Sequence, residues 1–322
     1  MKNLSHRRLM SGLLTFLIIS AAYAEDQSTW LKNEPITPIL PATELDEAKV
    51  QLGKRLFHDV NLSADGTVSC ASCHSIANGG IDGLKLSAGI KGQIGTRNAP
   101  TVFNSSLNFR QFWDGRARTL EEQVSGPLTN PMEMAGNWDD ALRYIRSHDK
   151  YKQAFMDSYG GQATQTNVAH AIAEFERSLV TPNGNFDRYL KGDESAIDQA
   201  TKRGYQLFQS FGCIACHQGV AVGGNFYEKI GVIIPYTYEL GEEPDLGRYQ
   251  LTSIDEDKFE FKVPGLRNVA RTAPYLHDGS IATLEEVVTI MAKHQLGREL
   301  NETEVSDIVK FLQSLNGELN VR

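Results

Sequence analysis

Cys70-Ala71-Ser72-Cys73-His74 has a second copy in this 322-residue chain, Cys213-Ile214-Ala215-Cys216-His217, and the two pentapeptides contain all four cysteines. Two cysteines separated by two residues and followed by a histidine are the attachment signature of a c-type haem. The thiols bond to one porphyrin, and the histidine coordinates its iron. A zinc site or a redox-active cysteine pair would not require the histidine in both copies. The pattern predicts two covalently bound haem c groups and leaves no cysteine for a disulfide.

The sequence around the two pentapeptides repeats as well. Each pentapeptide is preceded by a Gly-x-x-Leu-Phe segment and followed by an Asp-Gly segment that ends in Thr-Leu-Glu-Glu. The pairs are Gly53 to Phe57 with Gly204 to Phe208, Asp114 to Glu122 with Asp278 to Glu286, and Arg97-Asn98 with Arg267-Asn268. Repetition on this scale indicates that each half of the chain has the same plan.

Apolar residues recur at helical spacing in three long segments. They run from Leu45 to Leu56 after a Thr43 cap, from Val168 to Leu179 before Pro182, and from Val305 to Leu315 before Asn316-Gly317. Long loops such as 78–100 and 219–264 lie between them, and a buried porphyrin could organise such loops. We predict a mostly α fold with two cytochrome c-like haem domains related by internal duplication.

The composition divides the chain into four segments. Residues 1–24 resemble a secretory signal peptide, because basic residues precede a short apolar run and Ala22-Tyr23-Ala24 is a small-x-small cleavage site. Residues 25–43 contain three prolines and are expected to form an extended leader. The N-terminal domain is assigned to 44–180 and the C-terminal domain to 181–322, since turn-forming residues follow a helix end at Thr181.

The predicted signal peptide and the net charge suggest where the protein acts. The apolar run from Leu13 to Ile19 is too short to span a bilayer, so we expect an exported, periplasmic chain that does not cross the membrane. Removing residues 1–24, which contain three basic and no acidic residues, would change the formal charge from −8 to −11. An acidic surface argues against nucleic acid as a partner and could attract a basic electron-transfer protein.

The sixth coordination position of each iron decides whether the haem transfers electrons or catalyses a reaction. A methionine at this position raises the haem potential, whereas an open position admits a substrate. Met291 is the one methionine after His217 and lies on an apolar stripe at helical spacing. His277 and His294 are the competing candidates. Spacing alone leaves all three open.

Further segments along the chain resemble the bacterial dihaem cytochrome c peroxidases, in the family that also includes the MauG-type protein-modifying enzymes. They cover nearly the whole chain after the leader. The matching segments are Ser69 to His74, Asn98 to Val102, Gln111 to Arg116, Asn130 to Met134, Thr272 to Gly279, and Ile290-Met291.

This resemblance implies reduction of hydrogen peroxide to water, with electrons from a small periplasmic cytochrome c or cupredoxin. Met291 would be the axial ligand opposite His217 in a high-potential C-terminal haem. MauG-type enzymes have tyrosine at that position, so Met291 favours the peroxidase branch, and Tyr275 and Tyr236 are weak alternatives. His277 would orient neighbouring groups rather than bind iron.

The resemblance makes the N-terminal haem the peroxide site, with His74 as its proximal ligand. Glu133 would be the general acid and base, with Gln123 as a hydrogen-bonding residue beside it. Trp113 would relay electrons between the haems. In the repeat, Trp113 and His277 occupy equivalent positions, each directly before an Asp-Gly pair. Because Trp30 and Trp138 match no functional position, the relay prediction rests on Trp113 alone.

A calcium ion between the domains is also implied. Asn98 would supply a side-chain ligand, and Thr272 and Pro274 would supply backbone carbonyl ligands. Family members often form homodimers, so the resemblance makes a homodimer possible, although no residue pattern in this chain requires it.

One position departs from the family pattern. Many of these peroxidases hold a distal histidine on the oxidised N-terminal haem, and Ile90 stands in its place. Isoleucine cannot bind iron, so the N-terminal haem is expected to be open without reductive activation. His58, His148 or His170 could supply a substitute ligand. A MauG-like oxidase that modifies a partner protein and a dihaem electron carrier remain the alternative functions.

Overall fold

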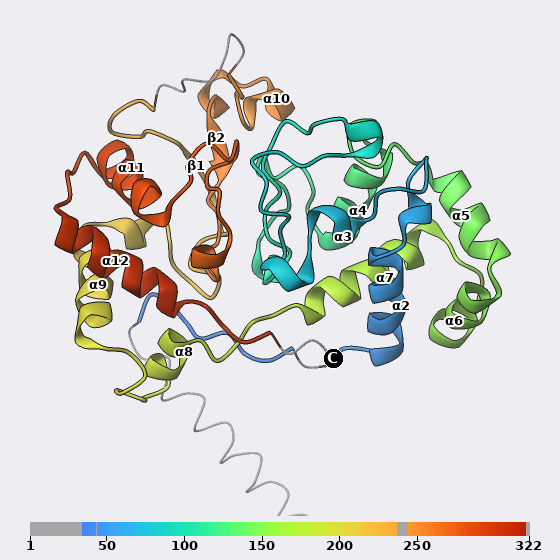
Figure 1. Ribbon diagram of the computed structural model, residues 1–322, viewed down its shortest axis with the longest axis horizontal. Helices are drawn as coiled ribbons and strands as arrows, with labels where there is room; N and C mark the ends of the chain where they lie inside the picture. The colour runs from blue at the N-terminus through green and yellow to red at the C-terminus, as the bar shows by residue number, and fades with distance from the viewer. Residues whose placement is uncertain (1–33, 43, 237–243, 320–322) are drawn as a thin grey trace, which may run out of the picture.

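The computed structural model describes residues 34–42, 44–236 and 244–319. The predicted signal peptide therefore lies outside the described residues. The described chain is mostly helical, as the sequence predicts, and its helices form two groups on either side of a short two-stranded sheet (Figure 1). The α-helices are α2 Glu47–Phe57, α3 Cys70–Cys73, α4 Leu120–Thr129, α5 Trp138–Ser147, α6 Asp149–Tyr159, α7 Gln165–Ser178, α8 Asn185–Leu190, α9 Gln199–Ser210, α10 Tyr249–Thr252, α11 Leu284–Leu296 and α12 Glu302–Ser314, and the strands are β1 Tyr227–Lys229 and β2 Glu260–Lys262.

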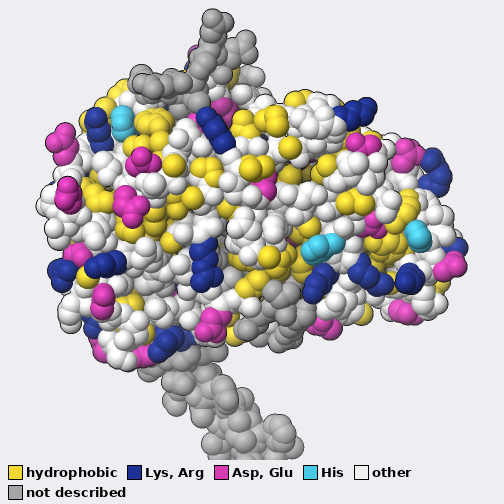
Figure 2. Space-filling model, in the orientation of Figure 1, with side chains coloured by type: hydrophobic (Ala, Val, Ile, Leu, Met, Phe, Trp, Pro, Cys, Tyr) yellow, Lys and Arg dark blue, Asp and Glu magenta, His cyan; other side chains and the backbone are white. Residues whose placement is uncertain are grey.

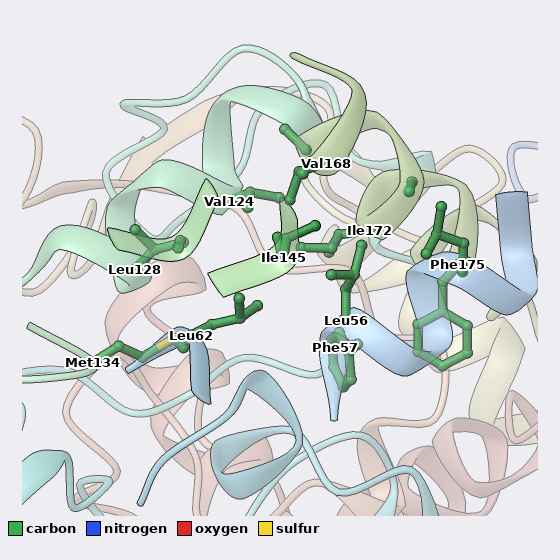
Figure 3. Packing of buried hydrophobic residues seen from close by; sticks show 14 of the residues in the cluster. Leu56, Phe57, Leu62, Val124, Leu128, Met134, Ile145, Val168, Ile172 and Phe175 are labelled. Carbon is green, nitrogen blue, oxygen red and sulfur yellow. The ribbon is translucent and has the colours of Figure 1, made fainter. Parts of the chain in front are cut away.

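The N-terminal group is built on the pair α2 and α7. Leu56 and Phe57 of α2 face Ile172 and Phe175 of α7, with side chains of α4 and α5 completing the cluster (Figure 3). The rings of Phe57 and Phe175 meet edge to face at 5.2 Å. Burial of this apolar surface is the main force that holds the helices together.

The C-terminal group is built on the pair α9 and α12. Phe208 of α9 and Phe311 of α12 lie 5.0 Å apart between ring centroids, and Phe186 of α8 packs against Phe311 at 4.9 Å. Gly53 and Gly204 have equivalent places in the two pairs, since each lies against a backbone carbonyl of the partner helix. The repeated glycine is therefore the point at which the paired helices approach most closely.

Matched backbone geometry corrects one part of the predicted repeat. Asn104 and Asn268 both have left-handed backbone, with φ of 61° and 60°, and both begin a short 3₁₀ turn. Each lies ten residues before the Asp-Gly pair of its half. Asn268 therefore corresponds to Asn104, and the pairing of Arg267-Asn268 with Arg97-Asn98 is wrong in register.

The two ends of the described chain cross between the helix groups. Gly219 donates its backbone N–H to the Pro35 carbonyl at 2.8 Å, and Arg267 donates to the Thr37 carbonyl at 2.7 Å. Ile36 is thereby buried in the C-terminal cluster, although α2 lies in the N-terminal group. At the other end, Leu319 packs on the N-terminal cluster. Both crossings tie the two groups together.

The helix predictions hold, but one cap differs. Asp46, rather than Thr43, caps α2, because its carboxylate accepts the backbone N–H groups of Ala48 and Lys49. Thr43 itself lies outside the described residues. Thr283 caps α11 with Glu286 as the reciprocal partner, and Asn301 caps α12 with Glu304.

We expect Gly53→Ala to destabilise the fold by about 2–3 kcal/mol. A Cβ at Gly53 would lie 1.8 Å from the Ala171 carbonyl oxygen, so α2 and α7 would have to separate. Gly161→Ala is the control, because a Cβ there meets no atom within 4 Å. Denaturant unfolding should show a lower midpoint for Gly53→Ala alone. Equal midpoints would contradict this role for Gly53.

Candidate functional site

The histidines of the two pentapeptides are held in the same way. The Nδ1 atom of His74 lies 3.3 Å from the Gly80 carbonyl oxygen, and Nδ1 of His217 lies 3.3 Å from the Val222 carbonyl oxygen. A hydrogen bond donated by Nδ1 leaves Nε2 as the ligand atom. Burial lowers the pKa of His74, and it lowers the pKa of His217 to about 4. Both imidazoles are therefore neutral, as an iron ligand must be.

The four cysteines are thiols without a disulfide partner. Burial raises the pKa of Cys70 to about 12 and that of Cys213 to about 11. Redox-active Cys-x-x-Cys pairs have a lowered pKa instead, because the thiolate is the reactive form. The raised pKa of both thiols therefore argues against a redox-active pair.

A cavity of about 290 Å³ opens beside His217, with mostly apolar walls. Met291, on α11, lines this cavity together with His217 and His277. His294 has a different setting, because its Nδ1 lies 2.9 Å from the Ile234 carbonyl and the residue is absent from the cavity wall. The mostly apolar wall fits an apolar, planar group, and both His217 and Met291 lie on this wall.

Glu133 lies close to the first pentapeptide, in the loop after α4. Its negative charge contributes to the raised pKa of Cys70 and Cys73, after the larger effect of burial. Burial also raises the pKa of Glu133, while a 2.6 Å hydrogen bond from Asn130 Nδ2 opposes this rise. A half-buried carboxyl group can act as a general acid and base when substrate lies within hydrogen-bond reach. Gln123 is half-buried on α4, and its predicted role stays a prediction.

Trp113 lies where the two helix groups meet. Its indole Nε1 donates to the Asn98 carbonyl at 2.9 Å, and its ring meets His277 edge to face at 6.3 Å. Trp113 lines the cavity beside His217. The preceding Phe112 also lines that cavity and packs against Gly126 of α4. The Phe112-Trp113 pair thus connects the C-terminal cavity with the N-terminal helices.

The three predicted calcium ligands lie along the same cavity wall. Asn98 donates from Nδ2 to the carbonyls of Leu84 and Lys85 at 2.9 and 3.3 Å. These hydrogen bonds do not use its Oδ1 atom. Among the described residues, no group of three His, Cys, Asp or Glu residues could hold a metal ion. A cation beside Thr272 and Pro274 would therefore depend on amide and carbonyl oxygens, which suit calcium.

Ile90 is buried in the N-terminal cluster and lies next to the Glu133 loop. Its backbone N–H donates to the Glu133 carbonyl at 2.8 Å. The substitute histidines have other settings: His58 Nδ1 lies 2.8 Å from the Lys54 carbonyl, His170 Nδ1 lies 2.9 Å from the Tyr159 hydroxyl, and His148 is exposed. None of these contacts directs a histidine toward His74.

An ion-pair network near Trp113 was not predicted from the sequence. Arg97 contacts Asp114 of the N-terminal Asp-Gly motif at 2.7 Å and Asp245 of the 244–264 segment at 2.6 Å. Phe261 of β2 stacks on His277 with ring centroids 4.1 Å apart. Arg97 and Asp245 lie 148 residues apart in sequence, and no motif or spacing in the sequence marks them as partners.

The surface beside the C-terminal cavity is partly apolar. Val232 and Ile233 are 50% and 60% exposed, and the backbone N–H of Ile233 donates to the His294 carbonyl at the end of α11. Figure 2 shows hydrophobic side chains gathered on this side of the molecule with acidic side chains among them. Within the described residues, no helix has the length and apolar character needed to cross a membrane.

Comparison with known proteins gives consistent matches. A family model described as di-haem cytochrome c peroxidase matches residues 47–195. The cytochrome c peroxidase Ccp of Escherichia coli (strain K12) is 46% identical over 89% of this chain, which spans only 62% of that protein. The cytochrome c551 peroxidase of Nitrosomonas europaea is 44% identical over 97% of this chain and 92% of that protein. A crystal structure of a MauG-like protein associated with microbial copper homeostasis superposes with a TM-score of 0.75 at 29% identity, covering 88% of this chain and 93% of that one.

Proposed function

Since the chain belongs to the di-haem cytochrome c peroxidase family, we propose that it reduces hydrogen peroxide to water with electrons from a small cytochrome c or cupredoxin. Each peroxide molecule takes up two electrons and two protons and gives two molecules of water. The observation that carries this proposal is the half-buried Glu133 beside the first pentapeptide, because an electron carrier without catalytic activity needs no carboxyl group of raised pKa there.

Proteins of this family contain two haem groups, and we propose that both are covalently attached to this chain. Cys70 and Cys73 would hold the N-terminal haem with His74 as proximal ligand. The C-terminal haem would be attached through Cys213 and Cys216, with its iron between His217 and Met291. These irons supply the oxidation and reduction chemistry when the haem groups are bound.

The protein side chains would manage the protons. Glu133 takes a proton from one peroxide oxygen and returns it to the other, so that the second oxygen leaves as water. Burial raises the pKa of this carboxyl group, which favours its protonated form more than in an exposed glutamate. Asn130 holds the carboxylate through its Nδ2 hydrogen bond. Gln123 would hydrogen-bond the substrate beside it.

Trp113 would relay electrons from the C-terminal haem to the N-terminal one. Its position at the cavity wall, with Phe112 reaching α4, supports this route. A calcium ion held by Asn98, Thr272 and Pro274 would stabilise the same region, since Asn98 binds the Trp113 indole through its carbonyl.

The remaining assignments extend this proposal to the whole chain. Residues 1–24 would direct export to the periplasm, and 25–43 would be the leader that precedes an N-terminal domain of 44–180. The C-terminal domain would comprise 181–322. The equivalent pairs α2–α7 and α9–α12 support internal duplication, while a homodimer remains a proposal from family resemblance.

The direct test of the proposed function is steady-state turnover. Holoprotein mixed with hydrogen peroxide and a reduced monohaem cytochrome c should oxidise the cytochrome in a ratio of two per peroxide. A MauG-like activity is the second candidate, which the similarity to a MauG-like structure favours. It predicts reaction with peroxide but little cytochrome oxidation. If the holoprotein does not react with peroxide at all, the result would favour a dihaem electron carrier without catalytic activity.

Ile90→His should make turnover depend on prior reduction. Ile90 is 4% exposed and hydrogen-bonded to the Glu133 loop, so a histidine at this position would be held near the N-terminal site. Ile94→His is the control, because Ile94 lies in the same loop but is 51% exposed. Turnover of fully oxidised enzyme should fall at least tenfold for Ile90→His alone. Unchanged turnover would remove Ile90 from the control of access.

A further inference from the structure

Lys262, at the end of β2, is a buried cation that the proposed reaction does not use. The residue is 7% exposed and lines the cavity beside His217. Among the described residues, no carboxylate lies within 4.0 Å of the Lys262 Nζ. Buried Arg267, by contrast, pairs with Asp187 at 2.6 Å. Burial alone lowers the pKa of Lys262 to about 8. Its ammonium is therefore still largely charged at neutral pH.

The position of Lys262 corresponds to that of Asn98 in the other half. Each lies sixteen residues before the Asp-Gly pair and two residues before a proline. The backbone N–H of Asn98 donates to the His277 carbonyl at 2.7 Å, and that of Lys262 donates to the Trp113 carbonyl, also at 2.7 Å. Where the N-terminal half presents an amide, the C-terminal half thus presents a positive charge.

An unpaired buried ammonium costs several kcal/mol of desolvation. Along the described cavity wall, Glu228 is the sole acidic residue. Because Lys262 lies on the cavity wall, a group that fills the cavity can supply the complementary negative charge. A haem group carries two propionate carboxylates, which are the kind of partner that would stabilise this ammonium.

We propose that Lys262 binds a propionate of the C-terminal haem and so raises the potential of that haem beside Trp113. This inference rests on the proposed function only in requiring the C-terminal haem. A fixed positive charge stabilises the reduced, less positive haem relative to the oxidised one. Lys262 would be a positioning residue, since it acts on the electron through the haem rather than on peroxide.

Redox titration of the holoprotein tests this proposal. Lys262→Met removes the charge at similar length, and we expect the reduction equilibrium constant of the C-terminal haem to fall at least tenfold, a shift of 59 mV. Lys262→Arg keeps the charge and should remain close to the wild type. Lys229→Met, an exposed lysine on β1, is the control and should leave both haem potentials unchanged.

An unchanged potential in Lys262→Met would overturn the proposal. If Lys262→Met fails to fold or to retain both haems, Lys262→Gln provides a neutral but polar replacement with the same expected shift. Peroxide turnover of the wild type is measured separately. A wild type without turnover but with a shifted potential in the variants would reject the peroxidase function while supporting the role of Lys262.

Discussion

Glu133→Gln is expected to lower peroxide turnover by about 10²–10⁴-fold while both haem spectra stay unchanged. Glutamine keeps the shape of the side chain and can still accept the 2.6 Å hydrogen bond from Asn130. It cannot accept and return a proton, so breakage of the peroxide bond loses its acid and base. Steady-state turnover at saturating cytochrome c measures the effect.

The control for this variant is Glu122→Gln. Glu122 lies on α4 of the same helix group, but its carboxylate is exposed and pairs with Arg118. We expect normal turnover from it, because a surface ion pair contributes little to the site. Normal turnover in Glu133→Gln would remove Glu133 from the mechanism, and loss of the N-terminal haem spectrum would point to a structural role instead.

Met291→His should lower the midpoint potential of the C-terminal haem by on the order of 0.2 V, within the ≈ 0.8 V range that axial ligands cover. Imidazole donates electron density more strongly than a thioether and stabilises oxidised iron. The donor would then be unable to reduce this haem, so turnover should fall along with the potential. A spectroelectrochemical titration measures the shift.

Met156→His is the matched control, because Met156 is 53% exposed on α6. Its potentials and turnover should equal those of the wild type. An unaltered titration in Met291→His would show that Met291 does not bind the iron. His277, which lines the same cavity, would then be the ligand to test next.

The helical plan could be predicted because the deciding signals are local. Apolar residues at helical spacing identify α2, α7 and α12, and their burial confirms the spacing. Helices α5 and α6 were missed; α5 has only Ala141 and Ile145 buried and carries two aspartates in its first turn. The Thr43 cap was wrong because Asp46, three residues later, satisfies the first backbone N–H groups.

The site was harder to predict where it depends on tertiary placement. Spacing could not separate Met291 from His294, which lie one helical turn apart, whereas the structure puts only Met291 on the cavity wall. Lys262 escaped notice because the repeat was read from Arg267-Asn268, a register that hides its correspondence with Asn98. The backbone angles of Asn104 and Asn268 correct that register.

The most direct test is a stopped-flow experiment in which fully oxidised holoprotein meets hydrogen peroxide and then reduced monohaem cytochrome c. Ile90 cannot occupy the distal iron position, so we predict a prompt spectral change followed by sustained oxidation of the cytochrome. Silence until the protein is half-reduced would show that another group blocks the N-terminal iron. That result would contradict the proposal of a peroxidase that needs no reductive activation.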